Sequence, residues 1–446
     1  MTATSSLADS SAGLLELRSV KVERHLTMDV VRGAAVLGML FRNIFVFGMP
    51  STAYALPLMW SGENVEDLLA WAFVEMYVDG SARALFSLLF GAGALFLLAR
   101  VDNQPQPQLD RFFRRLLWLM MFGLVHAYLL LSAIDILFIY GVLGLLIFPL
   151  RNLQPRTLIC LASIGMLLAA LVGTLNIEIE TENFSNQEQR TGHKTNIQPA
   201  TLLWTDDQLA ILNASNPEDE YEIAKELIEQ SWTIEITERQ LGYLANVAML
   251  AESSLHNHSL EILRTHLIDV GSTILIGMAL FRLGIITGAR STRFYLVLGA
   301  VSYLVGHALN GLEILAELPG MVFGLVVNDY ATVTYDVART SMALGHLSVL
   351  ILMTRVSQLA TVSRLLASVG RLALTNYLLQ TLICISLFFG FGVGLFGEFR
   401  HSELIVIALT IAVAQIVLSS AYVAYFSLGP LEWLLRKLVT WPERQN

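Results

Sequence analysis

The chain has 446 residues, of which 55% are hydrophobic and 15% are charged, and its mean hydropathy is +0.60. A soluble domain carries about 25% charged residues, so this composition excludes an ordinary soluble protein. The net charge of −9 and the scattered lysines and arginines exclude a nucleic-acid-binding protein. The apolar residues come in blocks of about twenty, the length that a helix needs to cross a bilayer. We therefore expect an all-α, polytopic transmembrane helix bundle.

The polar residues 1–26 hold no short apolar segment followed by a small-residue cleavage site, which predicts a tail and not a removed signal peptide. Two membrane bundles follow, over residues 27–175 and 267–436, and a second tail covers 437–446. The apolar blocks predict ten spans, at about residues 28–49, 77–99, 113–131, 134–150, 157–175, 267–288, 294–313, 336–354, 372–396 and 403–427.

Lysines and arginines alternate between the loops on the two sides of these spans. Loops 50–65, 131–134 and 314–335 contain neither residue, and loop 397–402 contains only Arg400. Because cytoplasmic loops carry the excess of basic residues, this alternation predicts that both termini lie in the cytoplasm.

Residues 176–266 form an acidic, polar insertion with helical apolar spacing in their second half. We expect a partly helical cap on the extracytoplasmic side, either a solvated loop or an element that gates access to the bundle. Residues 321–327 are apolar but too short to cross, so we expect a re-entrant or interfacial segment there.

Ionisable residues inside a membrane are costly and usually mark a site. The spacing of His126 and Asp135 on a predicted hairpin brings an imidazole and a carboxylate together, as a general base requires. A buried histidine satisfied by a partner is the alternative, and a local ion pair is the alternative for Asp79 and Arg83. The outer group of polar residues comprises Arg42, Asn43, Asp79, Arg83, His126, Asp135, His307, Asn310 and Arg339.

A second group lies near the inner face. Arg32 and Arg371 suit an anionic ligand such as the phosphates of a coenzyme. Alternatively, they form ion pairs with Asp29 and Glu432 that brace the inner face. His346 lies between the two groups, as a relay or as a hydrogen-bonded bridge between helices. The inner group comprises Asp29, Arg32, Arg371, Asn376, Gln380 and Glu432.

No metal motif, phosphate loop or CxxC pair occurs, and Cys160 and Cys384 lie in apolar runs, so we expect no metal site. Five segments, the first and the third in two parts each, resemble the YeiB family of bacterial integral membrane proteins, which ends in a domain of unknown function (DUF418). They are MDVVRG (28–33), RNI (42–44), LFSLLFGAG (85–93), GLVH (123–126), DILFIYG (135–141), GRLALTNYLLQ (370–380) and GPLEWLLR (429–436).

That family is more distantly similar to transmembrane acyltransferases of the heparan-glucosaminide acetyltransferase type. The shared element is Asp-x-x-Arg-Gly followed by an asparagine, matched here by Asp29, Arg32, Gly33 and Asn43. The relatives' catalytic histidine follows that asparagine, whereas here no histidine occurs between His25 and His126. The resemblance thus implies a base from elsewhere, and His126 is the candidate.

One hypothesis is a membrane acyltransferase, in which acyl-CoA binds near Arg32 and Arg371 and His126, held by Asp135, deprotonates an external acceptor. Asn43 or Arg83 would stabilise the oxyanion, and the other polar residues would bind substrate. The alternatives are a transporter or exporter of a small polar or anionic solute, and a structural or sensory protein. Each acts in a lipid bilayer, the first two on a small molecule, and a homodimer stays open.

Overall fold

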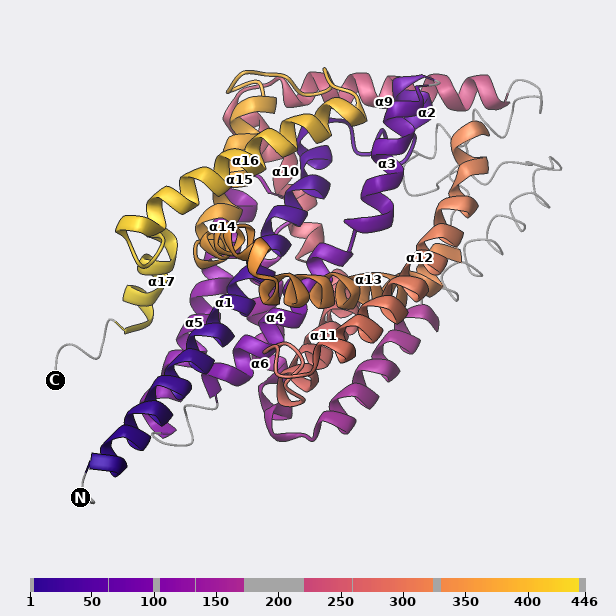
Figure 1. Ribbon diagram of the computed structural model, residues 1–446. Helices are drawn as coiled ribbons and strands as arrows, with labels where there is room; N and C mark the ends of the chain where they lie inside the picture. Colours follow the sequence, from indigo (N-terminus) through magenta and orange to yellow (C-terminus); the bar gives the residue numbers. More distant parts are fainter. Residues whose placement is uncertain are drawn as a thin grey trace.

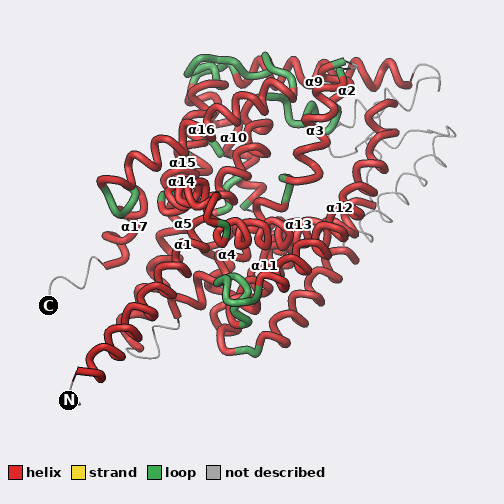
Figure 2. Tube along the Cα trace, in the orientation of Figure 1, coloured by secondary structure: helices red, strands yellow, loops and turns green. Residues whose placement is uncertain are grey.

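The computed structural model describes residues 4–62, 64–98, 105–132, 134–171, 220–258, 260–323 and 330–440. Within these ranges the chain forms helices joined by loops and no strand, as Figure 2 shows. The predicted all-α fold class is confirmed.

The helices of Figure 1 have the following bounds, in chain order. They are α1 (Thr4–Gly48), α2 (Pro57–Ser61), α3 (Val65–Tyr77), α4 (Ser81–Leu98), α5 (Pro105–Tyr128), α6 (Leu137–Ile147), η2 (Phe148–Asn152), α9 (Glu220–Arg239), α10 (Tyr243–Asn257), α11 (Leu260–Arg282), α12 (Thr292–Phe323), α13 (Tyr330–Arg355), η3 (Ser357–Leu359), α14 (Ala360–Arg371), α15 (Ala373–Phe388), α16 (His401–Tyr425) and α17 (Pro430–Thr440). A further apolar helix, Pro155–Leu171, lies between η2 and α9.

Within the described residues, five segments are long and apolar enough to cross a membrane: Leu26–Gly48, Val65–Leu98, Thr292–Ala316, Thr334–Arg355 and His401–Tyr425. The pair α14 and α15, bent by 78°, adds a sixth candidate. The chain is therefore a membrane protein with several apolar helices, but the predicted ten spans are not confirmed. The other four predicted spans fall on α5, on α6 with η2, on Pro155–Leu171 and on α11, which are shorter or more polar.

Helix α1 forms the centre of the bundle and contacts α4, α13, α14, α15 and α16. Its crossing with α14 is close, because a Cβ atom at Gly33 would overlap the carbonyl oxygen of Leu366. A Cβ at Gly370 would likewise overlap the carbonyl oxygen of Asp29. Small residues permit such close approach of two helices, so these two glycines fix where α1 and α14 cross.

Helices α3 and α4 form one apolar stretch that is interrupted at residues 78–80. Gly80 has a φ of +63°, a conformation that glycine adopts without steric cost. A Cβ there would lie 2.6 Å from Cγ of Arg339. Asp79 lies in this break, between α1 and α13.

Lipid-facing stripes show which surfaces lie against the bilayer. Four apolar side chains of α3 recur every four residues and are exposed, namely Val65, Leu69, Phe73 and Tyr77. On α12 the exposed apolar residues continue over about 28 Å of helix, the thickness of a bilayer core, and are Leu296, Val297, Val301, Leu304, Val305, Leu312 and Leu315.

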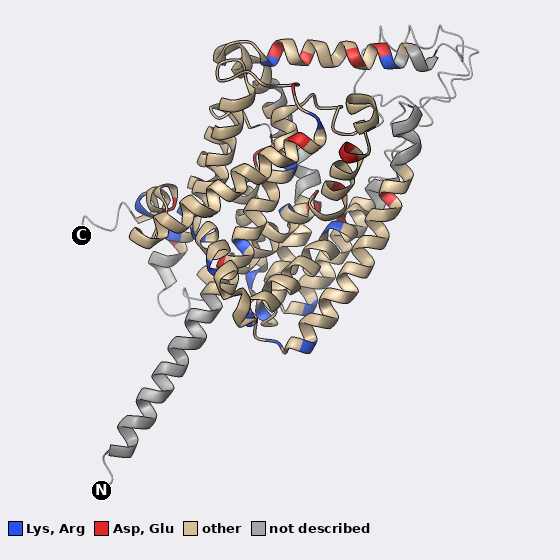
Figure 3. Ribbon diagram, turned by 45° about the horizontal axis from the view of Figure 1, so that its top comes forward, with Lys and Arg blue, Asp and Glu red and all other residues tan. Residues whose placement is uncertain are grey.

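The described part of the insertion forms a cap. In Figure 1 α9 runs along the top of the molecule and α10 lies beneath it, and Figure 3 marks several acidic residues in red along α9. Trp232 of α9 donates through Nε1 to Oγ1 of Thr52 at 2.6 Å, and the Gly390 amide donates to the carbonyl oxygen of Arg239 at 2.9 Å. These bonds tie α9 to the loops that follow α1 and α15.

Two sequence expectations concern residues that the structure describes only in part. Residues 176–219 of the insertion and residues 324–327 of the expected re-entrant segment lie outside the described residues. Residues 321–323 form the end of α12.

We predict that Gly33→Ala or Gly370→Ala lowers the thermal unfolding midpoint of the protein in detergent, because each added methyl group meets backbone atoms. Overpacking of this kind costs about 1–3 kcal/mol. Gly93→Ala is the matched control, since a Cβ at Gly93 of α4 meets no atom within 4 Å. Equal midpoints for all three variants would contradict a close α1–α14 crossing.

Candidate functional site

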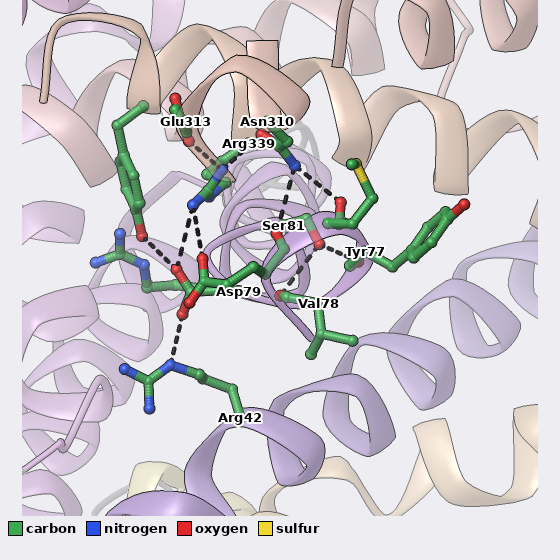
Figure 4. Close-up of polar contacts among 12 residues, drawn as sticks. Arg42, Tyr77, Val78, Asp79, Ser81, Asn310, Glu313 and Arg339 are labelled. Atoms are coloured by element: carbon green, nitrogen blue, oxygen red, sulfur yellow. Dashed lines mark hydrogen bonds and ion pairs between the residues drawn. The ribbon is translucent and has the colours of Figure 1, made fainter. Parts of the chain in front are cut away.

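Arg339 of α13 lies at the centre of a buried ionic cluster. Its guanidinium lies 2.7 Å from Oε2 of Glu313, 3.3 Å from Oε2 of Glu75 and 3.7 Å from Oδ2 of Asp79. It also donates to Oδ1 of Asn310 at 2.5 Å, as drawn in Figure 4. One guanidinium thus pairs with three carboxylates at the point where α3, α4, α12 and α13 meet. Only 7% of the Arg339 side chain is exposed, so these pairs are buried.

Asp79 extends this cluster to α1. Nε of Arg42 lies 2.6 Å from Oδ1 of Asp79 (Figure 4), and the Tyr335 hydroxyl donates to Oδ2 at 3.3 Å. The Arg42 guanidinium lies 4.0 Å from the ring centroid of Tyr54, a cation–π contact. Burial, and then the charge of Glu75, raise the pKa of Tyr54 in the loop after α1. Its phenol therefore stays a donor, to Oε1 of Glu75 at 2.7 Å.

Arg83 lies one helical turn past Asp79 and has a different partner. Its Nη2 lies 2.9 Å from Oδ2 of Asp269 in α11. The two side chains line a small cavity with Asp336 and Arg339 of α13 and Ser87 of α4. The local Asp79–Arg83 ion pair that the sequence offered is therefore not formed, because each residue pairs with another helix.

His126 lies between two side chains that it hydrogen-bonds. Its Nδ1 is 2.7 Å from Oδ1 of Asp135, and its Nε2 is 2.8 Å from Oγ1 of Thr381 in α15. The Phe138 amide donates to the second carboxylate oxygen of Asp135 at 2.8 Å. We call Asp135, His126 and Thr381 the His126 triad. Both the histidine and the aspartate side chains are 0% exposed.

The His126 triad lies beneath the cap. Thr381 is eight residues after the first residue of α15, Ala373, which is about 12 Å along the helix. The α5–α6 hairpin carries the other two members, and α10 lies over its turn. Tyr243 donates to the Leu129 carbonyl at 2.7 Å, and the ring centroids of His258 and Phe138 lie 4.6 Å apart. The predicted approach of His126 to Asp135 is therefore found, and their place in the outer group stays a prediction.

The inner group is brought together around Asp29. Nη1 of Arg32 lies 3.1 Å from Oδ1 of Asp29, and Nε of Arg371 lies 3.6 Å from Oδ2. Arg115 of α5 also lies near Arg32 and Glu432, so three guanidiniums and two carboxylates gather here. The side chains of Arg32 and Arg371 are 31% and 48% exposed, so they remain accessible to the phosphates of a coenzyme.

Glu432 caps a helix and forms no ion pair with Arg32 or Arg371. Its carboxylate accepts from the Leu374 amide at 2.7 Å and from the Thr375 amide at 3.1 Å. The Thr375 hydroxyl donates to it as well, at 2.6 Å. A carboxylate at the first turn of a helix satisfies free amides and the helix dipole. The expected Arg–Glu432 strut is therefore replaced by a cap on α15.

Asn376 and Gln380 form a polar seam between α15 and α16. Gln380 Nε2 donates to Oε1 of Gln415 at 2.8 Å and to the Val36 carbonyl at 3.3 Å. Asn376 Nδ2 donates to Oγ of Ser419 at 2.9 Å. Because both side chains are buried and bonded to neighbouring helices, they hold α1, α15 and α16 in register.

The remaining predicted residues have separate places. His346 is hydrogen-bonded to the Tyr303 hydroxyl at 2.8 Å and to the Tyr77 carbonyl at 2.8 Å, so it bridges three helices. Asn43 is half-buried. No described contact joins Asn43 or Arg83 to His126. Among the residues that the structure describes, no group of three His, Cys, Asp or Glu side chains could hold a metal ion.

Sequence reasoning missed five participants, and four of them carry a recognisable signal. Glu75, Asp269, Glu313 and Asp336 are acids in or beside apolar blocks, which the rule for intramembrane charges would have selected. Thr381 carries no such signal, because a threonine in an apolar helix is common.

Comparisons with known proteins identify relatives of this chain and name no activity. The family described as "Protein of unknown function (DUF418)" matches residues 280–442. The uncharacterized protein YeiB of Escherichia coli (strain K12) is 30% identical over 432 residues, covering 94% of this chain and 96% of the relative. The uncharacterized protein YxaH of Bacillus subtilis (strain 168) is 25% identical over 430 residues, covering 93% and 94%. No solved structure matches.

We predict that Glu313→Gln destabilises the protein strongly, because it removes a negative charge that faces the buried Arg339. Removing one partner of a buried ion pair typically costs about 3–5 kcal/mol. Arg400→Ala is the control, since its pair with Glu403 is 49% and 43% exposed. Unfolding in detergent measures both variants, and a loss no larger for Glu313→Gln than for Arg400→Ala would contradict the cluster.

Proposed function

This chain belongs to the YeiB family, and we propose that it is a transmembrane acyltransferase that moves an acyl group from cytoplasmic acyl-CoA to an extracytoplasmic acceptor. The His126 triad is the observation that carries the proposal. A hydroxyl, an imidazole and a carboxylate in hydrogen-bonded sequence are the arrangement that activates a hydroxyl for acyl transfer.

The atoms of the triad have defined roles in this proposal. Asp135 accepts a hydrogen bond from Nδ1–H of His126, which leaves Nε2 free to accept one from the Thr381 hydroxyl. As Oγ1 of Thr381 attacks the thioester carbon, its proton moves to Nε2 and then to the departing CoA sulfur. The acceptor's hydroxyl or amine attacks the resulting ester and gives its proton to Nε2, which passes it to Oγ1 of Thr381 as the ester bond breaks. Chemistry there requires the α5–α15 contact to open, because His126 has no exposed surface.

The donor site is proposed at the inner face. Arg32, Arg371 and Arg115 outnumber Asp29 and Glu432 there, and arginines bind phosphate groups well. Asn43 is the proposed oxyanion donor, since the Arg83 guanidinium is engaged by Asp269. Asp29, Asp79, Arg42, Asn376, Gln380 and His346 shape and hold the surrounding bundle. A homodimer remains a proposal without a surface assigned to it.

A transporter or exporter of a small polar or anionic solute is the second candidate. The cavity beside Arg83 and Asp269 favours it, because polar sites in transporters lie between helices that are interrupted inside the membrane. Helices α3–α4 and α14–α15 are both interrupted in this way. Solute flux in proteoliposomes that is indifferent to acyl-CoA would support transport over acyl transfer.

We further propose a bacterial inner membrane with both termini in the cytoplasm. Arg282 and Arg355 support one basic face, because they donate to loop carbonyls: Arg282 to Leu153 at 2.7 Å and Arg355 to Gly288 at 2.7 Å. Cations near helix C-termini are favourable. The start of α1 lies at the bottom of Figure 1, opposite α9.

We predict that purified protein given radiolabelled acetyl-CoA acquires a covalent label that Thr381→Val loses and Thr381→Ser keeps. His126→Ala and Asp135→Asn should slow labelling, the former about 100-fold or more, since a general base contributes that much. Arg400→Ala should label like the wild type. Protein that binds no CoA and takes no label would refute the proposal. If the labelled acetyl group reaches an acceptor while the protein itself stays unlabelled, the acceptor attacks the thioester directly and no covalent threonine ester forms.

We predict that a fluorescent protein fused after residue 446 folds and fluoresces in cells, and that alkaline phosphatase fused there is inactive. Alkaline phosphatase inserted within residues 176–219 should be active, because we place the cap outside the cytoplasm. The reverse pattern would invert the proposed orientation.

A further inference from the structure

We infer that Asp269 and Asp336 together hold one exchangeable proton, in a cavity between α4, α11 and α13. This inference is independent of acyl transfer, because no described contact joins the pair to the His126 triad. Asp269 of α11 and Asp336 of α13 both line this cavity. Two carboxylates that share one enclosed site repel each other, and a proton on one of them relieves that repulsion.

The charges that face the pair lead to the same conclusion. Arg83 from α4 binds Asp269 at 2.9 Å, and Arg339 from α13 is already shared by Glu75, Asp79 and Glu313. No further guanidinium lines the cavity.

Counted with the adjoining cluster, the cationic residues are Arg42, Arg83 and Arg339 and the acids are Glu75, Asp79, Asp269, Glu313 and Asp336. Two carboxylates are thus in excess inside the bundle. Uncompensated buried charge is costly, and hydroxyl donors relieve part of it, from Tyr54 to Glu75 and from Thr334 to Glu313. A proton on the Asp269–Asp336 pair removes one of the two excess charges.

The cavity itself has room for about one water molecule. Arg339 lines it, and Nε of this residue is buried and has no hydrogen-bond partner. A water molecule that accepts from Nε would lie beside the carboxyl pair, with Thr340, Ser87 and Tyr335 as further polar neighbours. Such a water is the group with which the pair would exchange its proton.

Infrared spectroscopy of the full-length protein in proteoliposomes tests this inference without any activity. The wild type should show a protonated-carboxyl C=O band that shifts after transfer to D₂O and disappears at alkaline pH. Asp336→Asn should lose that band. Asp110→Asn should keep it, since the Asp110 side chain is 70% exposed and paired on its own helix with Arg114.

Three outcomes would overturn the inference. The first is a wild type without an acid band, and the second is a band that survives in a folded Asp336→Asn protein. The third is a band that appears only after sodium is removed, which would assign a metal cation to the pair in place of the proton. If Asp336→Asn does not fold, the alkaline loss and the D₂O shift of the wild-type band decide the question.

Discussion

Pairing of charges inside an apolar environment is the constraint on which the rest of this structure depends. A single ionised group near the middle of a bilayer costs at least about 2.5–3.5 kcal/mol, and Arg339 alone faces three carboxylates from other helices. The interruption between α3 and α4 serves this pairing. Without Gly80 in its positive-φ conformation, an unbroken helix would not bring Asp79 between Arg42 of α1 and Arg339 of α13.

Helix α1 couples the two faces of the protein. Arg32 and Arg42 lie ten residues apart on it, about 15 Å, and take part in the inner and outer ionic groups respectively. Between them, the Val36 carbonyl accepts from Gln380 of α15. The close glycine crossing with α14 fixes α1 near its inner group, so a shift of α1 along its axis would disturb both groups at once.

Sequence alone predicted the contacts between near neighbours and few of those between distant helices. His126 and Asp135 are nine residues apart on one hairpin, and the Asp29–Arg32 pair is three residues apart; both are found. The pair of Asp29 with Arg371, between α1 and α14, was also among the alternatives and is found. Asp79 pairs with Arg42 and Arg339 rather than with Arg83, because helix packing, not spacing, sets these partners. The ten expected spans were inferred from hydropathy and loop charges, and four of them fall on helices that are shorter or more polar than the six candidates.

The burial of the His126 triad has a meaning for the proposed reaction. The side chains of its histidine and aspartate have no exposed surface, so a thioester would reach Thr381 only after the α5–α15 contact opens. Thr381 follows Gln380, which is bonded to the part of α1 between Arg32 and Arg42. A motion that opens the triad would therefore also act on the helix that carries Arg32 of the proposed donor site. In the proposed reaction, a buried triad of this kind keeps water from the thioester.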